Sequence, residues 1–174
     1  KWYCKAHKKL VDDSFMFIFW SMKYLSLAYQ IFDVNRVIFW QQPNMVSSIS
    51  GDFSYDITPI IVIRKGNPRL TKDAGLWDKS SVLNFTKPQG NYKKDKLCHN
   101  CQKPQALLEH LVWLSDADHE GNVIGDFFAG SGSLLRAVNK ADVILCDQND
   151  EYYDKFFDVN VTDERVYKCK KIVK

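Results

Sequence analysis

The stretch GDFFAGSGSLLRAV, residues 125–138, combines residue types that can hold a nucleoside-like ligand. Asp126 follows a short apolar run, and Gly130 and Gly132 flank a serine just before an apolar pattern typical of a helix. Glycines allow the backbone to approach a ligand closely. In open α/β sheets, ligands bind beyond the carboxyl ends of the strands. The sequence therefore predicts a strand–loop–helix unit that binds a ligand here.

Three classes of ligand compete for this loop. A phosphate loop ends in Gly-Lys-Ser/Thr, whereas this loop ends in Gly-Ser-Leu, which excludes that class. A dinucleotide loop needs a third glycine, and Leu135 stands at that position. S-adenosylmethionine has no phosphates but needs a carboxylate for its ribose hydroxyls, and Asp147 follows Asp126 by 21 residues. The same spacing suits a dinucleotide, so a nicotinamide-dependent oxidoreductase stays open as an alternative.

Apolar patterns around the loop predict alternating strands and helices. We expect strands at 14–20, 36–42, 58–68, 121–128, 142–147 and 164–173, with 14–20 buried on both faces. We expect helices at 21–32, 103–116, 132–141 and 149–157. The region 66–101 has little periodicity and is expected to be loop-like. The alternation predicts an α/β fold with a parallel or mostly parallel twisted sheet and helices on both faces.

Several of these segments together resemble the DNA methyltransferases that modify the exocyclic amine of adenine or cytosine. DFFAGSGS (126–133) resembles their D-P-F-x-G-S-G-T loop, and CQKPQALLEHLV (101–112) resembles the helix that precedes it. ILCDQNDEYYD (144–154) is similar to their strand with the ribose-binding acid, and VIFWQQPN and DITPIIVIRKG are similar to two earlier strands. The resemblance implies a Rossmann-like methyltransferase fold, S-adenosyl-L-methionine as cofactor and DNA as partner.

The resemblance also implies a set of cofactor-binding residues. They are Asp126, Phe127, Phe128, Ala129, Gly130, Ser131, Gly132, Ser133, Asp147, Gln148, Lys103 and Pro104. We expect Asp147 to accept hydrogen bonds from the ribose and Phe128 to pack beside the methionine portion or the adenine. The alternatives are that Asp126 caps its own loop, that Asp147 caps the following helix, and that Phe128 belongs to the core. Phe127 replaces the family's proline, and Ser133 replaces its threonine.

A basic segment lies between Arg64 and Lys103. It holds ten basic and three acidic residues, a net charge of +7 in a chain whose net charge is +3, and Trp77, Phe85 and Tyr92 are interleaved with them. Such a pattern suits contacts with DNA phosphates and bases, and the alternative is an ordinary solvated loop. The resemblance places a recognition insert here. The DNA-binding residues that we expect are Lys87, Lys93, Lys94 and Lys96.

The position of the glycine loop late in the chain fits the permuted class of these enzymes, in which the catalytic half comes first. We therefore expect one domain over 1–174, with a catalytic half at 1–65, the basic recognition region at 66–101 and a cofactor-binding half at 102–174. The family's catalytic tetrapeptide, Asp/Asn/Ser-Pro-Pro-aromatic, does not occur in the sequence, so the catalytic residues are unassigned. We expect a preceding segment or a partner chain to supply it, with 1–10 as the helix just after it. The alternative is an inactive subunit that holds cofactor or DNA for a partner.

The composition is that of an ordinary globular protein: 174 residues, 45% hydrophobic and 26% charged. No apolar run reaches the roughly 20 residues of a membrane span. The five cysteines are odd in number and irregular in spacing, which favours a reducing compartment, cytoplasmic or nucleoid-associated. CHNC (98–101) has the spacing of half a zinc site, but a second pair at the required spacing is missing from the sequence. We expect no metal.

Overall fold

The computed structural model describes residues 2–45, 53–89, 101–149 and 166–169. The chain divides into two compact units, an N-terminal unit, Lys1–Lys87, and a C-terminal unit, Pro88–Lys174. The finer division into a catalytic half, a recognition region and a cofactor-binding half stays a prediction.

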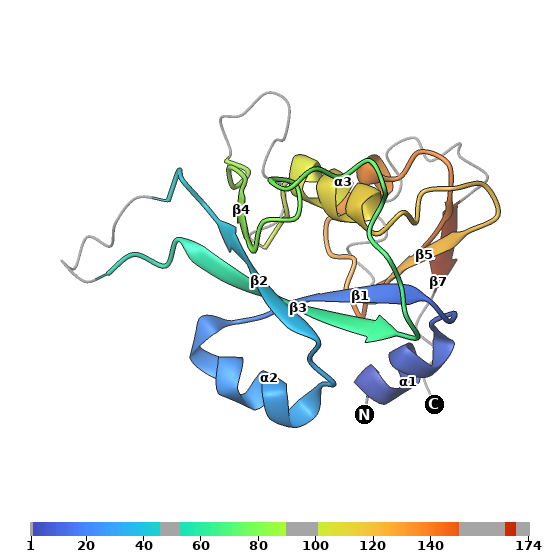
Figure 1. Ribbon diagram of the computed structural model, residues 1–174, viewed down its shortest axis with the longest axis horizontal. Helices are drawn as coiled ribbons and strands as arrows, with labels where there is room; N and C mark the ends of the chain where they lie inside the picture. The colour runs from blue at the N-terminus through green and yellow to red at the C-terminus, as the bar shows by residue number, and fades with distance from the viewer. Residues whose placement is uncertain (1, 46–52, 90–100, 150–165, 170–174) are drawn as a thin grey trace. The chain divides into compact units, whose positions relative to one another are not determined.

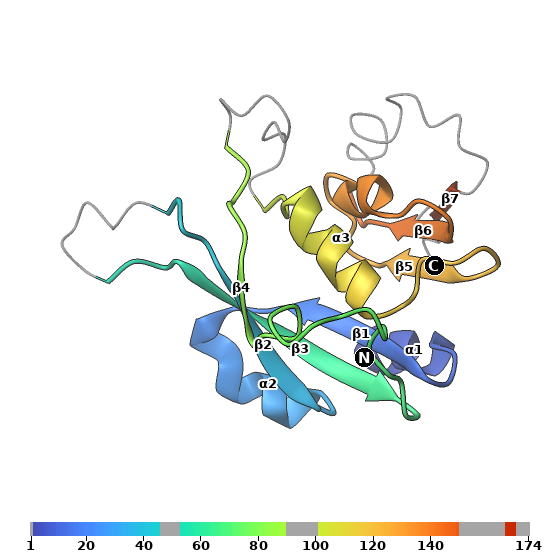
Figure 2. The same ribbon diagram turned by 45° about the horizontal axis from the view of Figure 1, so that its top comes forward.

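The N-terminal unit is built on a sheet whose strand order is β1-β3-β2-β4 (Figures 1 and 2). Its strands are β1 (Ser14–Phe19), β2 (Arg36–Gln41), β3 (Ile57–Lys65) and β4 (Val82–Asn84). β3 lies antiparallel between β1 and β2, and only the β2–β4 pair is parallel. The prediction of a mostly parallel sheet is therefore wrong for this unit. The chain reverses direction between β2 and β3, where the Gln42 N–H donates to the Asp56 carbonyl (2.7 Å) and continues the antiparallel ladder.

The central strand β3 forms the core of this sheet. Its run of β-branched residues favours extended structure, and Ile60, Ile61 and Ile63 are completely buried. β1 differs from the prediction, because all six of its residues are only partly buried. The reason is its position: among the described strands β1 pairs with β3 alone and lies at the edge of the sheet.

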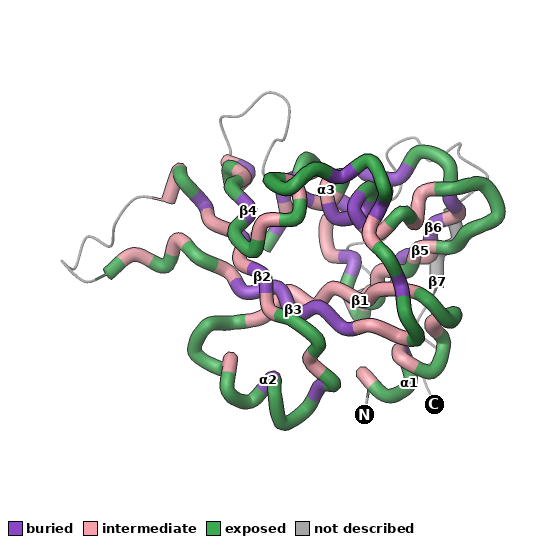
Figure 3. Tube along the Cα trace, viewed as in Figure 1, coloured by how far each residue is buried: buried purple, intermediate pink, exposed green. Residues whose placement is uncertain are grey.

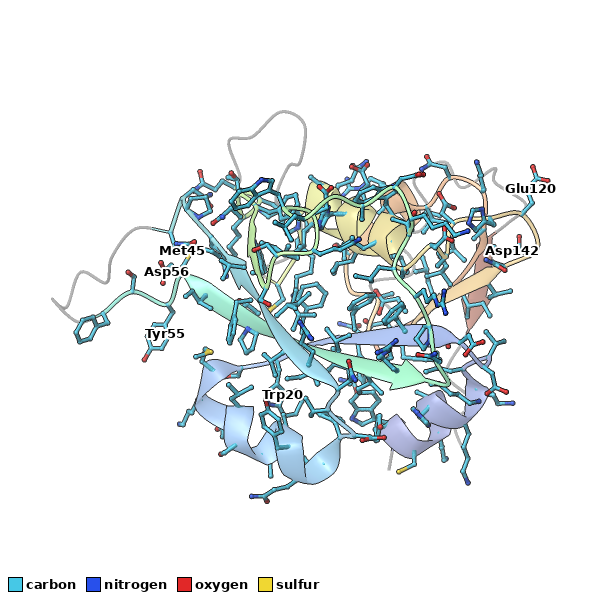
Figure 4. All side chains as sticks on the ribbon, viewed as in Figure 1. Trp20, Met45, Tyr55, Asp56, Glu120 and Asp142 are labelled. Carbon is cyan, nitrogen blue, oxygen red and sulfur yellow. The ribbon has the colours of Figure 1, made fainter. Side chains whose placement is uncertain are left out.

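Two helices lie against one face of this sheet. They are α1 (Trp2–Lys9) and α2 (Leu25–Ile31), the latter preceded by the 3₁₀ turn η1 (Met22–Tyr24). Ala28 and Phe32 pack against Ile61 and Ile63 of β3, and the rest of α2 is largely exposed (Figure 3). The indole of Trp20 lies beside α2 (Figure 4), with its ring centroid 5.2 Å from that of Phe32. The helix predicted at 21–32 is confirmed.

Residues 66–89, the main described part of the region predicted to be loop-like (66–101), include a short strand, β4. Leu83 is buried at 4% exposure. Backbone bonds tie both flanks of β4 to β2: the Phe39 N–H donates to the Ser81 carbonyl (2.8 Å), and the Phe85 N–H donates to the Gln41 carbonyl (3.2 Å). The prediction missed β4 because three residues are too few to show a period.

The C-terminal unit contains a parallel sheet in the order β5-β6-β7. The strands in its described residues are β5 (Val123–Asp126), β6 (Asp142–Cys146) and β7 (Val166–Cys169), and the helical elements there are α3 (Gln105–Leu114) and the 3₁₀ turn η2 (Ser133–Ala137). The strands and α3 confirm the predicted elements. The helix predicted at 132–141 is wrong, since only η2 forms and the backbone of Val138 is already extended. The helix predicted at 149–157 lies largely outside the described residues.

Side chains from α3, η2, β6 and the segments between them form the core of this unit. The cluster contains Val112, Ala129, Leu134, Val138, Ala141, Val143 and Leu145. The Gln105 Nε2 also donates to the Arg136 carbonyl (3.0 Å), which joins the start of α3 to η2. α3 and η2 are thereby held beside the strands that carry the predicted loop.

Three further properties of the described residues concern membrane-spanning helices, metal sites and free cysteines. None of their helices combines the length and apolar character needed to cross a bilayer. They contain no group of three or more His, Cys, Asp or Glu side chains that could hold a metal ion. Cys4 is a free thiol, and Cys98 lies outside the described residues.

Candidate functional site

The predicted loop, residues 126–133, starts at the carboxyl end of β5, and Asp147 directly follows β6. β5 and β6 are parallel, with Asp126 opposite Leu145. The carboxyl ends of both strands therefore meet at one edge of the C-terminal sheet. The structure brings the glycine loop and the predicted ribose-binding acid together there.

Backbone hydrogen bonds fix the loop to the end of β6. The Gly130 N–H donates to Asp147 Oδ2 (2.8 Å), and the Ala129 N–H donates to the Cys146 carbonyl (3.0 Å). The Gly132 N–H donates back to the Ala129 carbonyl (2.7 Å) and closes a turn. Gly130 and Gly132 have φ values of +48° and +68°, a conformation that costs a residue with a Cβ roughly 1–2 kcal/mol. Glycine is required at these two positions by the turn itself.

Asp147 accepts hydrogen bonds with both carboxylate oxygens. Oδ2 accepts from Gly130, and Oδ1 accepts from the Asn149 N–H (3.0 Å). The second contact caps the backbone locally, and the helix that the alternative for Asp147 expected it to cap, 149–157, lies largely outside the described residues. The link to the glycine loop had no signal in the sequence. An ionised carboxylate offers about four acceptor positions, so these two amides are compatible with further donors such as ribose hydroxyls.

Asp126 caps its own loop and also belongs to a charged cluster. Its Oδ1 accepts from the Phe128 N–H (3.0 Å). Burial raises the pKa of Asp126 above its usual range; the Phe128 N–H and the Lys103 ammonium oppose this rise, and the neighbouring Asp147 carboxylate adds to it. Lys103 donates through Nζ to the Cys101 carbonyl (2.8 Å). Lys103 and Asp147, from two other segments, are therefore close enough to Asp126 to affect its ionisation.

The other predicted cofactor-binding residues differ in how far their side chains are exposed to solvent. Phe127 and Phe128 are 42% and 62% exposed, so the alternative that Phe128 belongs to the core is wrong. The remaining members include buried and exposed residues: Ala129, Ser133 and Pro104 are buried, Ser131 is half-buried with its Oγ 2.7 Å from that of Ser133, and Gln148 is exposed. The site is thus a closed backbone turn with two aromatic rings on its surface.

Sequence reasoning missed one buried polar residue next to this site. Gln102 is 2% exposed and directly precedes Lys103. A glutamine in a polar stretch carries no pattern that would indicate its burial.

The predicted DNA-binding lysines are only partly described. Lys87 ends the N-terminal unit, where its N–H donates to Asn44 Oδ1 (2.8 Å) and its carbonyl accepts from Asn44 Nδ2 (2.9 Å). These bonds fix the backbone of Lys87 and do not involve its ammonium group. Lys93, Lys94 and Lys96 lie outside the described residues.

Comparison with known families decides the identity of the chain. A family model described as DNA methylase matches residues 1–158. The chain belongs to the N6/N4 family of DNA methylases. This confirms the family resemblance that the sequence motifs indicated.

One curated relative of this DNA methylase family member is the type II methyltransferase M.HpaI of Haemophilus parainfluenzae. The two are 24% identical over 208 residues, which cover 97% of this chain and 63% of the relative. The chain therefore spans less than two thirds of the length of that methyltransferase.

Solved structures show the fold of this methylase family member. The structure of the M1.HpyAVI–SAM complex is 21% identical, with a TM-score of 0.68, and the match covers 88% of this chain and 77% of that one. The PvuII DNA methyltransferase, which is cytosine-N4-specific, is 15% identical, with a TM-score of 0.66 and coverage of 94% and 72%. The predicted α/β class with a Rossmann-like methyltransferase fold is confirmed, apart from the antiparallel pairs of the N-terminal sheet.

Proposed function

We propose that the chain binds S-adenosyl-L-methionine at the loop between β5 and η2. We further propose that it takes part in methyl transfer to the exocyclic amine of adenine or cytosine in DNA. The observation that carries the proposal is the bond between the Gly130 N–H and Asp147 Oδ2 (2.8 Å). It sets the carboxylate of one strand beside the glycine turn of the neighbouring strand, as a nucleoside needs. The family of DNA methylases supports the reaction.

The residues at this edge fit the chemical groups of the cofactor. The carboxylate of Asp147 can accept from ribose hydroxyls, and the glycine turn leaves room for the backbone to approach. Phe127 and Phe128 offer exposed apolar faces to adenine or to the methionine chain. Asp126 is a desolvated carboxyl whose charge a cationic methionine portion would stabilise. When bound, S-adenosyl-L-methionine supplies an activated methyl group on its sulfonium sulfur.

The acceptor side of the reaction requires DNA and a group that holds the target amine. We propose that the basic segment from Arg64 to Lys103, including Lys87, Lys93, Lys94 and Lys96, contacts the DNA, because its charge is +7. The sequence contains no Asp/Asn/Ser-Pro-Pro-aromatic tetrapeptide. We propose that a further segment or a partner chain supplies the acceptors for the amine.

Calorimetry on the 174-residue chain tests the cofactor assignment. S-adenosylhomocysteine, the demethylated cofactor, should bind with measurable heat, and a nicotinamide dinucleotide should not bind at the same concentration. The reason is the absence of a third glycine in the loop, where Leu135 stands. Tighter binding of the dinucleotide than of S-adenosylhomocysteine would show that the assignment is wrong.

A further inference from the structure

A turn in the N-terminal unit, residues 72–79, presents two adjacent apolar side chains to solvent. Leu76 is 83% exposed and Trp77 is 87% exposed, and most of the turn is exposed (Figure 3). Single exposed apolar residues are ordinary on protein surfaces. An adjacent leucine and tryptophan at this exposure leave a large apolar area in water, which a binding partner would cover.

The turn that carries these side chains is well fixed. Thr71 and Ala74 are buried, and the Ala74 N–H donates to the Thr71 carbonyl (3.3 Å). The Gly75 N–H donates to Asp78 Oδ2 (2.8 Å), and the Ser80 N–H closes on the Trp77 carbonyl (3.1 Å). β4 begins two residues later and pairs with β2. The backbone that carries the Trp77 indole is therefore held in place by hydrogen bonds, so that the turn loses little conformational entropy when the indole binds a partner.

The charges around the turn favour a nucleic acid as the partner. Arg69, Lys72 and Lys79 are exposed, and none of them forms an ion pair in the described part of the chain. Of the two acids in the turn, Asp78 directs its carboxylate to the Gly75 amide, and Asp73 is exposed. In a nucleic acid the phosphates lie on either side of the flat faces of the bases. The cationic side chains around Leu76 and Trp77 can therefore contact phosphates while the two apolar side chains contact bases.

We propose that Leu76 and Trp77 form a wedge that stacks against the bases of the DNA substrate. This inference rests on the proposed function, and it assigns the turn with Leu76 and Trp77 as the part of the chain that enters the base stack. A base that reacts at its exocyclic amine must leave the stack, and its neighbours then lack a stacking partner. Apolar side chains inserted between bases are a known way to hold such distorted DNA.

The structure selects Trp77 from the three aromatic residues of the basic segment. Phe85 is half-buried, and its carbonyl accepts from the Trp40 indole N–H (2.7 Å). Tyr92 lies outside the described residues. Trp77 is the one whose ring is both described and almost fully exposed.

Binding of fluorescently labelled duplexes, measured by anisotropy at low salt, tests the wedge. One duplex is intact, and the other carries a single abasic site that leaves a gap in the stack. Trp77→Ala should weaken binding of the abasic duplex about tenfold or more, whereas Trp77→Phe should retain most of the affinity. Tyr29→Ala is the matched control, because Tyr29 is a 61% exposed aromatic residue on α2, and it should have no effect.

Salt dependence separates stacking from attraction between charges. The Trp77→Ala variant should keep the wild-type slope of log affinity against log salt, because an indole neutralises no phosphate. The Lys79→Ala variant should have a shallower slope, because each lost phosphate contact lowers it by about 0.9. A Trp77→Ala slope that falls like that of Lys79→Ala would contradict the wedge.

Three further results would overturn the inference. They are equal affinity of wild type and Trp77→Ala for the abasic duplex, a change in self-association of Trp77→Ala without a change in DNA binding, and no DNA binding by the wild type. Loss of S-adenosylhomocysteine binding with intact Trp77-dependent DNA binding would instead refute the proposed cofactor site and leave the wedge standing. A thermal melt of each variant controls for folding. If the alanine variant unfolds, Trp77→Gln, which removes the aromatic ring but keeps a long side chain, replaces it and should weaken binding of the abasic duplex to the same extent.

Discussion

Two carboxyl groups, Asp126 and Asp147, meet at the edge of the C-terminal sheet and accept hydrogen bonds from different backbone amides. Asp147 accepts from two backbone amides. Asp126 accepts from one, and its burial raises its pKa. Its ionised form is therefore disfavoured in the folded chain, and a ligand cation beside it would lower the pKa again. By linkage, deprotonation of Asp126 and binding of a cationic ligand should favour one another.

Replacing Asp147 tests the predicted ribose contact. Asp147→Ala should weaken S-adenosylhomocysteine binding by on the order of ten- to a hundredfold, because hydrogen bonds from hydroxyls to a charged carboxylate contribute roughly 1.5–3 kcal/mol. Asp147→Asn keeps one oxygen that can accept from the Gly130 amide, so it should preserve the loop but still lose much of the affinity. Titration calorimetry measures both variants.

The control for Asp147 lies at the other end of the same strand. Asp142 begins β6 (Figure 4), and Asp142→Asn should leave the affinity unchanged. If a folded Asp147→Ala variant also binds like wild type, Asp147 returns to the role of a local cap for the Asn149 amide.

At the scale of elements, Asp118 joins the connections that precede β5 and β6. Its carboxylate accepts from the backbone N–H groups of Asn139, Lys140 and Ala141, at 3.0, 2.7 and 3.0 Å. Burial alone would raise the pKa of Asp118, but these bonds and one from the Asn139 side chain outweigh it and lower the pKa below 3.8. The link fixes the amino ends of both strands, opposite the glycine loop.

Replacing Asp118 should destabilise the C-terminal unit. Asp118→Asn exchanges one acceptor oxygen for an NH₂ group that faces amide donors, and should lower the free energy of unfolding by about 1–3 kcal/mol at neutral pH. Because the folded pKa is lowered, the stabilisation by the carboxylate is complete above the ordinary value of 3.8 and is lost as pH falls through the folded value. Urea unfolding should therefore show a large difference at pH 7 that shrinks below about pH 3.8.

A neighbouring aspartate provides the control for this experiment. Asp116 is exposed and contacts the exposed His119 (3.0 Å). Asp116→Asn should change the free energy of unfolding by less than about 0.5 kcal/mol. An equal effect of the two substitutions would mean that Asp118 does not hold the two connections together.

Asp118 also explains an element that the sequence pattern predicted wrongly. The apolar spacing in 132–141 is helical, yet the amides of 139–141 donate to Asp118 and not to carbonyls four residues earlier. Sequence periodicity does not detect a side chain 21 residues upstream. In the same way, the apolar run of β3 predicted a strand, but its antiparallel position between β1 and β2 depends on pairing that strand–helix alternation does not specify.

The candidate site was predictable in its residue types and not in its contacts. Gly130, Gly132 and Asp147 follow from the chemistry of a nucleoside and from strand spacing. The hydrogen bond from Gly130 to Asp147 depends on the register of two parallel strands. The family resemblance assigned Lys103 to the cofactor site, and its approach to Asp126 had no signal in the sequence.

At the scale of the whole molecule, the chain carries its proposed contacts in two units. The glycine loop belongs to the C-terminal unit, and the Leu76–Trp77 turn belongs to the N-terminal unit. The DNA methylase family model extends over both units. The N-terminal unit therefore belongs to the family match as well as the unit that carries the cofactor loop. Replacing Trp77 in the N-terminal unit should therefore affect DNA binding but not cofactor binding, and replacing Asp147 in the C-terminal unit should weaken cofactor binding.

Methyl transfer itself should require more than these two bindings. The lone pair of an exocyclic amine is delocalised into the base ring, so acceptors must draw its hydrogens out of the plane before it attacks the sulfonium methyl in line. The sequence has no tetrapeptide that would present such acceptors. In an assay with radiolabelled S-adenosyl-L-methionine and mixed-sequence DNA, the 174-residue chain alone should therefore transfer no methyl groups above background.

Calorimetry on the same preparation should still show S-adenosylhomocysteine binding, which separates a missing acceptor from a chain that has not folded. Adding a chain that carries the tetrapeptide, or testing a longer protein that contains both, should restore transfer. Robust turnover by the chain alone would locate the amine acceptors within residues 1–174. In that case the polar groups near the wedge and the loop, Asp73 and Asp126 first, would be the candidates to replace, because each is a carboxylate with an oxygen that can accept a hydrogen bond from the amine.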